Sequence, residues 1–173
     1  MLKKIIISVL LIICTSLLVV GDKYYKEKQT VKDENAKLYE LAFDSFWELE
    51  TGITVGVKYV SINTKTFKGI SDEDKKRLFA YIEEKYKLTV LDMSFAELRA
   101  AGYIIEPAKD GFYHKFVNGI LIEGEKYNSY SSDSVSFEGK VYRRALGEIG
   151  FHFEAVRKNK KWQLKECYRT WMS

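Results

Sequence analysis

The sequence has little cysteine, histidine or proline: two cysteines, two histidines and one proline in 173 residues. One cysteine, Cys14, lies in an N-terminal apolar run, so Cys167 has no thiol partner for a disulfide within a folded domain. Catalytic motifs that spacing alone can identify are also missing, namely G-x-S-x-G, G-x-G-x-x-G, the P-loop, H-E-x-x-H and Ser-x-x-Lys. These absences exclude a disulfide framework and leave no catalytic residue to predict.

The two histidines also lack the neighbours that a metal site needs. Neither His114 nor His152 has a second ligand nearby in sequence, and a zinc site with Cys167 would depend on the fold to assemble it. His152 stands between Phe151 and Phe153, so in an alternating strand it is expected to point outward. We predict no metal site and no cofactor.

Charge of one sign is also scarce. The formal net charge is +4, and Lys3 and Lys4 ahead of the apolar run supply two of these charges. A nucleic-acid-binding surface needs a concentrated basic face, so nucleic acid is not an expected partner. The aromatic share of 14% is typical of a folded domain.

The N-terminus resembles a targeting signal, with Lys3 and Lys4 followed by an uncharged run over residues 5–20. A helix of that length spans about 24 Å, short of a hydrocarbon core of about 30 Å, but flanking lysines and tyrosines can extend it. We favour an uncleaved anchor in the cell membrane over secretion after cleavage near Gly21. Both place the rest of the chain outside the cytoplasm, because the paired lysines stay inside. Ile13 is too large for the residue before a lipidated cysteine, so Cys14 is expected to stay unmodified.

The first half of the remaining chain favours helices. A helix is predicted over 33–50, with an exposed row of carboxylates at Glu40, Asp44 and Glu48, and Gly52 is expected to end it. A β-rich segment over 53–63 follows, with alternate residues from Ile53 to Tyr59 on one face. Two further helices begin at predicted N-caps, Ser71 and Ser94, separated by a short strand over 87–93, and Glu97 completes a capping box with Ser94.

The second half favours strands. A loop is predicted over 106–119, and four strands then follow over 120–127, 133–145, 150–158 and 161–170. The short gap at Lys158–Lys160 predicts an antiparallel hairpin. The expected fold is α+β: an N-terminal membrane helix, then helices packed on one face of a mainly antiparallel sheet with a C-terminal strand meander. The expected parts are an anchor or signal peptide over 1–21, a tether over 22–32, and one domain over 33–173.

Two regions are candidate binding sites. In "RRALGEIG", over 143–150, the two glycines should form a tight turn or bulge, through positive φ or close backbone approach. Arg143 and Arg144 precede that turn on opposite sides of a strand, so one should reach the concave face and meet either a carboxylate of the domain or an anionic ligand. The aromatic group Phe112, Tyr113 and His114 either lines a ligand pocket or covers the core, and core packing is favoured.

A basic cluster near the C-terminus, made by Arg157, Lys158, Lys160, Lys161, Lys165 and Arg169, either faces anionic lipid or cell-wall polymer or is a solvated hairpin face. The solvated face is the favoured interpretation.

The segment with Tyr142, Arg143, Gly147 and Gly150, followed by Trp162 and a terminal Trp-x-Ser, resembles the end of small, poorly characterised bacterial extracytoplasmic proteins. The resemblance covers most of residues 53–173, and some relatives are labelled peptide-transporter accessory proteins. Helices followed by a curved antiparallel sheet that ends in K-x-W are also similar to NTF2-like or cystatin-like folds, which imply no function by themselves.

Two functions compete. The favoured one is a non-enzymatic, membrane-tethered module that binds a peptide, an envelope polymer or a membrane protein. The alternative is a small hydrolase-like enzyme with a pocket in a cone-shaped α+β domain and His114 or a helix carboxylate as general base. A groove beside an exposed strand would favour binding, and a pocket with several polar groups of shifted pKa would favour catalysis.

Overall fold

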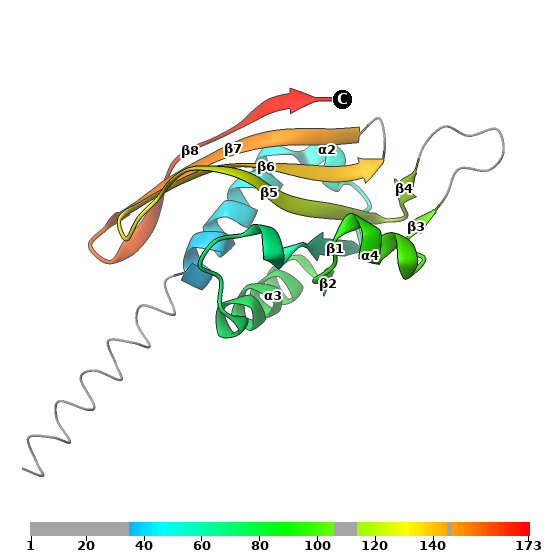
Figure 1. The fold of residues 1–173 in the computed structure, drawn as a ribbon, viewed down its shortest axis with the longest axis horizontal. Coiled ribbons are helices and arrows are strands. Elements are labelled where there is room, and N and C mark those ends of the chain that lie inside the picture. The colour runs from blue at the N-terminus through cyan, green and yellow to red at the C-terminus, as the bar shows by residue number, and fades with distance from the viewer. Residues whose placement is uncertain (1–34, 106–113, 145–146) are drawn as a thin grey trace, which may run out of the picture.

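The computed structural model describes residues 35–105, 114–144 and 147–173. These residues form an α+β fold, as predicted, in which a few helices pack against a curled mixed sheet (Figure 1). The predicted anchor over 5–20 and the tether over 22–32 lie outside the described residues. Within the described residues, no helix is long and apolar enough to cross a membrane.

Two of the described helices begin at capping signals. A first helix covers residues 35–49, and the short α2 (Thr51–Thr54) follows it. Beyond the 3-10 turn η1 (Thr64–Thr66), α3 (Asp72–Tyr86) and α4 (Phe95–Ala100) begin after Ser71 and Ser94. The hydroxyl of each serine accepts a hydrogen bond from the backbone N–H three residues later. The acidic side chain at that position accepts one from the backbone N–H of the serine, so the predicted N-termini are confirmed.

Within the described residues the sheet has eight strands. Four long antiparallel strands form the predicted meander: β5 (Gly119–Tyr130), β6 (Ser134–Arg144), β7 (Gly147–Lys158) and β8 (Lys161–Met172). The sheet is mixed because β1 (Tyr59–Ile62) runs parallel to both β5 and β2 (Thr89–Leu91). Two short strands, β3 (Ile104–Ile105) and β4 (Lys115–Phe116), extend the edge beside β6. Only β4 lies within the segment over 106–119 that was predicted as a loop.

The predicted hairpin between β7 and β8 is confirmed. Lys158 pairs with Lys161, and the two residues between them, Asn159 and Lys160, have φ of 51° and 62°. Positive φ at both central positions is the geometry of a type I′ turn, whose twist matches that of the flanking strands.

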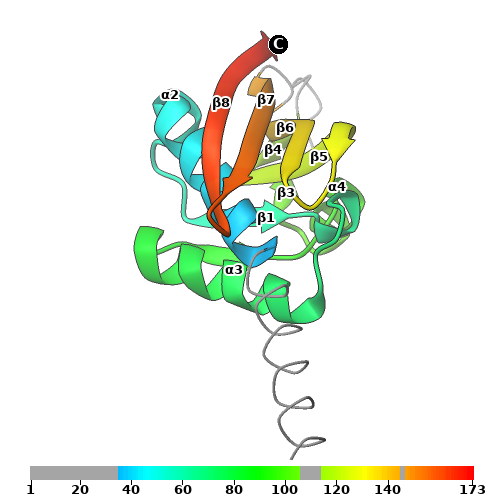
Figure 2. The same cartoon turned by 90° about the vertical axis from the view of Figure 1, so that its left-hand side faces the viewer.

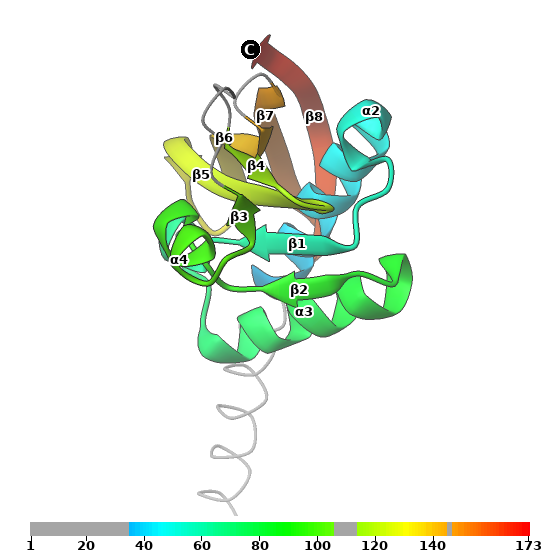
Figure 3. The ribbon, with the colours of Figure 1, turned by 90° about the vertical axis from the view of Figure 1, so that its right-hand side faces the viewer.

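The sheet curls around the first helix (Figures 2 and 3). Phe46 of that helix packs against inward-facing side chains of the meander, and its ring centroid lies 5.4 Å from that of Phe151. Leu78 and Ile82 of α3 close the same core from the β1 side. Burying such side chains is the main stabilising contribution to the domain, about 1.5–3 kcal/mol for each large one.

Helices cover both faces of the sheet, so the prediction of a single covered face was wrong. Leu98 of α4 packs on Leu121 and Tyr142 in a second apolar cluster. Strand neighbours alternate between faces, and Ile120 and Ile122 belong to the main core around the first helix. The α4 cluster therefore lies on the outer face, opposite the first helix.

The segment after the first helix is not the long strand that its β-rich residues predict. Residues 51–54 form α2, Gly52 lies inside this helix instead of ending the first one, and the strand is limited to β1. Ile53 is buried in the main core, whereas Val55 is 69% exposed. Tertiary packing of one side chain thus outweighs a local strand propensity that depends on context.

The carboxylate row on the first helix was predicted to be exposed to solvent, but most of it is not. Glu40 is buried and pairs with Lys37, and only Glu48 is exposed. Asp44 accepts hydrogen bonds from the hydroxyls of Tyr81 and Tyr86, each at 2.7 Å. Burial and this carboxylate raise the pKa of both tyrosines above the ordinary value. Asp44 therefore ties the first helix to α3.

Candidate functional site

Arg143 is placed by a bulge in β6. The pairing of β6 with β7 shifts register between Tyr142 and Arg144, so Arg143 is the extra residue. Its guanidinium donates to the backbone carbonyls of Ile53 at 2.7 Å and Val55 at 2.8 Å, at the end of α2. Arg143 is therefore bound by two backbone oxygens, whereas the sequence predicted a carboxylate or an anionic ligand as its partner. A cation suits this position because the last carbonyls of a helix lack intrahelical donors.

Arg144 lies one residue further along β6 and is exposed. In the sheet its backbone lies opposite that of Lys115 in β4. Its side chain lies over Gly147, where an added Cβ would come within 2.8 Å of the arginine Cγ. At Gly150, an added Cβ would come within 2.1 Å of the Trp171 indole nitrogen, and φ is not positive there. Close approach, not positive φ, therefore explains the glycine at position 150.

Arg169 of β8 joins the same region through a paired carboxylate. Its guanidinium donates to both oxygens of Glu50, Nε to Oε1 and Nη2 to Oε2, each at 2.7 Å. The Glu50 side chain is only 3% exposed. These hydrogen bonds raise the pKa of Arg169. Two parallel charge-assisted bonds occupy both oxygens of Glu50, so it is a poor candidate for a general base.

These residues line one groove of about 530 Å³, bounded by α2 and by the ends of β6, β7 and β8. Among the described side chains that line it, four are cationic and one is a carboxylate: Lys115, Arg143, Arg144, Arg169 and Glu50. Three apolar side chains on the same groove are open to solvent, Leu49, Val55 and Met172, at 40%, 69% and 65% exposure. The groove is therefore basic with an apolar rim.

No known protein family, curated protein or solved structure matches this sequence. The chemistry of the chain must therefore be argued from its own geometry.

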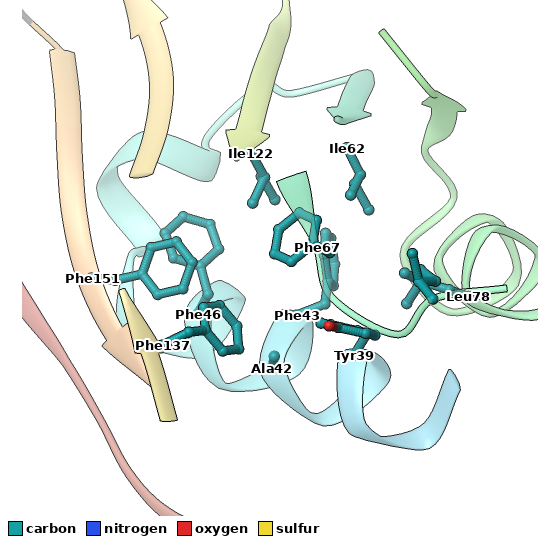
Figure 4. Close-up of a pocket in the computed structure, with 11 residues that line it drawn as sticks. Tyr39, Ala42, Phe43, Phe46, Ile62, Phe67, Leu78, Ile122, Phe137 and Phe151 are labelled. Atoms are coloured by element: carbon teal, nitrogen blue, oxygen red, sulfur yellow. The ribbon is translucent and has the colours of Figure 1, made fainter. Parts of the chain in front are cut away.

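The space between the first helix and the curled sheet is too small for a substrate. The cavity there measures about 30 Å³ and is lined by apolar and aromatic side chains, among them Phe46, Phe137 and Phe151 (Figure 4). That volume is on the scale of one or two water molecules, and a cavity with such walls stays dry. Tyr39 reaches it, but its hydroxyl donates to the Lys68 carbonyl and burial raises its pKa. Among the described residues, core side chains therefore fill most of the space between the first helix and the sheet.

Of the predicted aromatic group, Phe112 and Tyr113 lie outside the described residues. His114 is half-buried, its carbonyl accepts the Tyr142 hydroxyl at 2.7 Å, and its ring lies edge-on to Phe95 with centroids 6.0 Å apart. His114 thus packs beside the α4 cluster and does not line the basic groove.

The basic cluster of the last hairpin is divided among several partners. Arg157 donates to the Ser132 carbonyl, Lys165 pairs with Glu154 at 2.8 Å, and Arg169 pairs with Glu50. Lys158, Lys160 and Lys161 are exposed at the tip.

Sequence reasoning identified Arg143 and Arg144 but missed Lys115, Glu50 and α2 as parts of the same groove. Arg169 was noted only as a member of the hairpin cluster. Glu50 and Arg169 are 119 residues apart, and no local pattern signals that they pair.

Proposed function

We propose that this chain is a membrane-tethered, extracytoplasmic binding module without catalytic activity, and that its basic groove captures an acidic peptide or protein segment. The observation that carries the proposal is the groove itself, where cationic side chains outnumber the single carboxylate, and that carboxylate is already paired. Arg144 and Lys115 are both exposed, whereas Arg143 is held by carbonyls and Arg169 by Glu50, so Arg144 is the most available of the three arginines.

The apolar rim favours a peptide over a polyol phosphate of the cell envelope. Leu49, Val55 and Met172 present hydrophobic surface beside the guanidinium groups. An acidic peptide offers apolar side chains and carboxylates together, whereas a polyol phosphate offers few apolar atoms. Planar guanidinium groups also match carboxylates in a bidentate geometry.

Binding is supported over catalysis by the state of the nucleophilic and basic groups. Burial raises the pKa of the Cys167 thiol to about 11, so it is protonated at neutral pH and a poor nucleophile. Glu50, the one carboxylate among the described side chains of the groove, is bound in both its oxygens. The extracytoplasmic and tethered parts of the proposal rest on Lys3, Lys4 and the apolar run over 5–20.

The test uses the full-length chain in detergent micelles and fluorescent peptides that combine leucine with glutamate, each compared with its glutamine isostere. We expect the acidic peptide to bind about tenfold more tightly than the isostere, because a tenfold change in affinity corresponds to roughly the free energy of one charge-assisted hydrogen bond. Arg144→Ala should abolish that difference, and Lys76→Ala, which removes an exposed charge on α3, should leave it intact. Equal affinity for the two peptides, or no effect of Arg144→Ala, would refute the proposal.

A further inference from the structure

A second group of chemically capable side chains lies on the outer face of the sheet, on the opposite face from the first helix. His152 and Glu154 are two residues apart on β7 and therefore point to the same side. Glu166 of β8 is the strand partner of Glu154. One ligand atom from each of the three residues lies within 4.8 Å of the others.

His152 is held rigidly with one nitrogen directed at this group. Its ring stacks on Tyr168, with centroids 4.9 Å apart and planes at 24°, and its side chain is only 10% exposed. The earlier expectation of an outward histidine is correct for the face but not for exposure, because Tyr168 covers the ring. Its Nε2 atom lies 3.7 Å from Oε1 of Glu166, too long for a hydrogen bond. A nearly buried imidazole thus faces two carboxylates with no direct hydrogen bond to them.

Lys165 shows that a cation can occupy the position beside Glu154. Its ammonium lies 2.8 Å from Oε1 of Glu154. The lysine side chain is 57% exposed, and an exposed ion pair of this kind is weak. A divalent ion would offer the same carboxylate twice the charge.

We propose that His152, Glu154 and Glu166 form a binding site for a divalent transition metal of the zinc type, with Lys165 as the competing cation. One imidazole and two carboxylates are a suitable donor set for such an ion, and three protein ligands leave a position open for water. Ligand atoms around zinc lie about 3.4 Å apart, from bond lengths of about 2.0–2.1 Å. The separations of up to 4.8 Å must therefore shorten by up to about 1.4 Å, and Glu166 can move because its side chain is 48% exposed.

Such a site would join β7 to β8. This proposal is independent of the basic groove, since none of its three ligands lines that groove.

The experiment titrates zinc into the full-length chain in detergent, with a competing chelator to measure affinity. We expect His152→Ala to weaken binding at least a hundredfold and Glu166→Gln at least tenfold. His114→Ala is the matched control, because it removes the other histidine and should leave affinity unchanged. Lys165→Met should tighten binding severalfold, since it frees Glu154 from its ammonium.

The Lys165→Met variant separates a specific metal site from adventitious binding. Removing a lysine that is not a ligand should strengthen simple surface attraction much less than it strengthens binding to a carboxylate that the lysine occupied. The proposal is wrong if His152→Ala keeps wild-type affinity, or if Lys165→Met weakens it. Zinc binding that is lost only in Cys167→Ser would also overturn it. If His152→Ala fails to fold, Glu166→Gln decides, because that exposed side chain can be changed without opening the core.

Discussion

Replacing Arg143 by alanine tests whether this arginine holds α2 against the end of the sheet. The guanidinium makes two hydrogen bonds to carbonyls that are some 90 residues away in sequence. The bond to Ile53 is partly buried and should contribute about 1.5 kcal/mol, at the lower end for a charged donor. The bond to Val55 is exposed, so solvent reduces its contribution to about 0.5 kcal/mol. Arg143→Ala should therefore cost about 2 kcal/mol.

Thermal and urea unfolding of the full-length chain, followed by circular dichroism, measures this loss. For a domain of this size, about 2 kcal/mol corresponds to a fall in Tm of roughly 4–8 °C. Arg143→Lys should recover less than half of the loss, because one ammonium cannot match both carbonyls with the geometry of a planar fork.

The matched control is Arg144→Ala, which removes the neighbouring exposed charge and should change the free energy of unfolding by less than about 0.5 kcal/mol. An Arg143→Ala variant with the wild-type Tm would refute the role assigned to the two carbonyl bonds. Equal losses in both variants would show that the charge of the segment matters and the specific bonds do not.

Four further predictions concern other parts of the chain. Ser94→Ala should lower the free energy of unfolding by roughly 0.5–2 kcal/mol through loss of the α4 cap; an unchanged urea midpoint would contradict this. Lys65 and the cap lower the pKa of Glu97 to about 2, so its stabilising effect is fully present above pH 4.5 and is lost as pH falls toward 2. The unfolding midpoints of wild type and Glu97→Gln should accordingly differ at pH 6 and converge near pH 2. Gly150→Ala should displace Trp171, changing its fluorescence and costing about 1 kcal/mol, and an unaltered emission spectrum would refute the close approach. A reporter enzyme that works only outside the cytoplasm should be active when it is fused after Ser173. Activity of a fused reporter that works only in the cytoplasm would refute the predicted orientation.

Local signals predicted much of the fold. The capping serines, the Lys158–Lys160 turn and the alternation in the last four strands act over a few residues, and each is confirmed in the structure. The same kind of local reasoning failed over residues 53–57, where a strand was expected. There, burial of Ile53 and the bonds from Arg143 decide the backbone, and neither is visible in the segment itself.

The candidate sites show the same division. Arg143 and Arg144 were found because they precede a predicted glycine turn, but the carbonyls that hold Arg143 belong to Ile53 and Val55, 90 and 88 residues away. The outer-face group was missed because alternation places His152 on the correct face but cannot show which β8 residue lies opposite. That register depends on the turn and on a bulge between Glu154 and Ala155.

The sequence alone therefore determined the α+β class, the helix starts, the meander and the absence of a motif-defined catalytic set, because these depend on local propensity, periodicity and spacing. The tertiary structure decided that helices cover both faces of the sheet, that the concave face is filled by the first helix, and that Asp44 is a brace between helices. It also decided which side chains lie together, Glu50 with Arg169 and His152 with Glu166. Such pairs depend on strand register and on packing between distant segments, which follow from the energy of the whole chain rather than from any window of it.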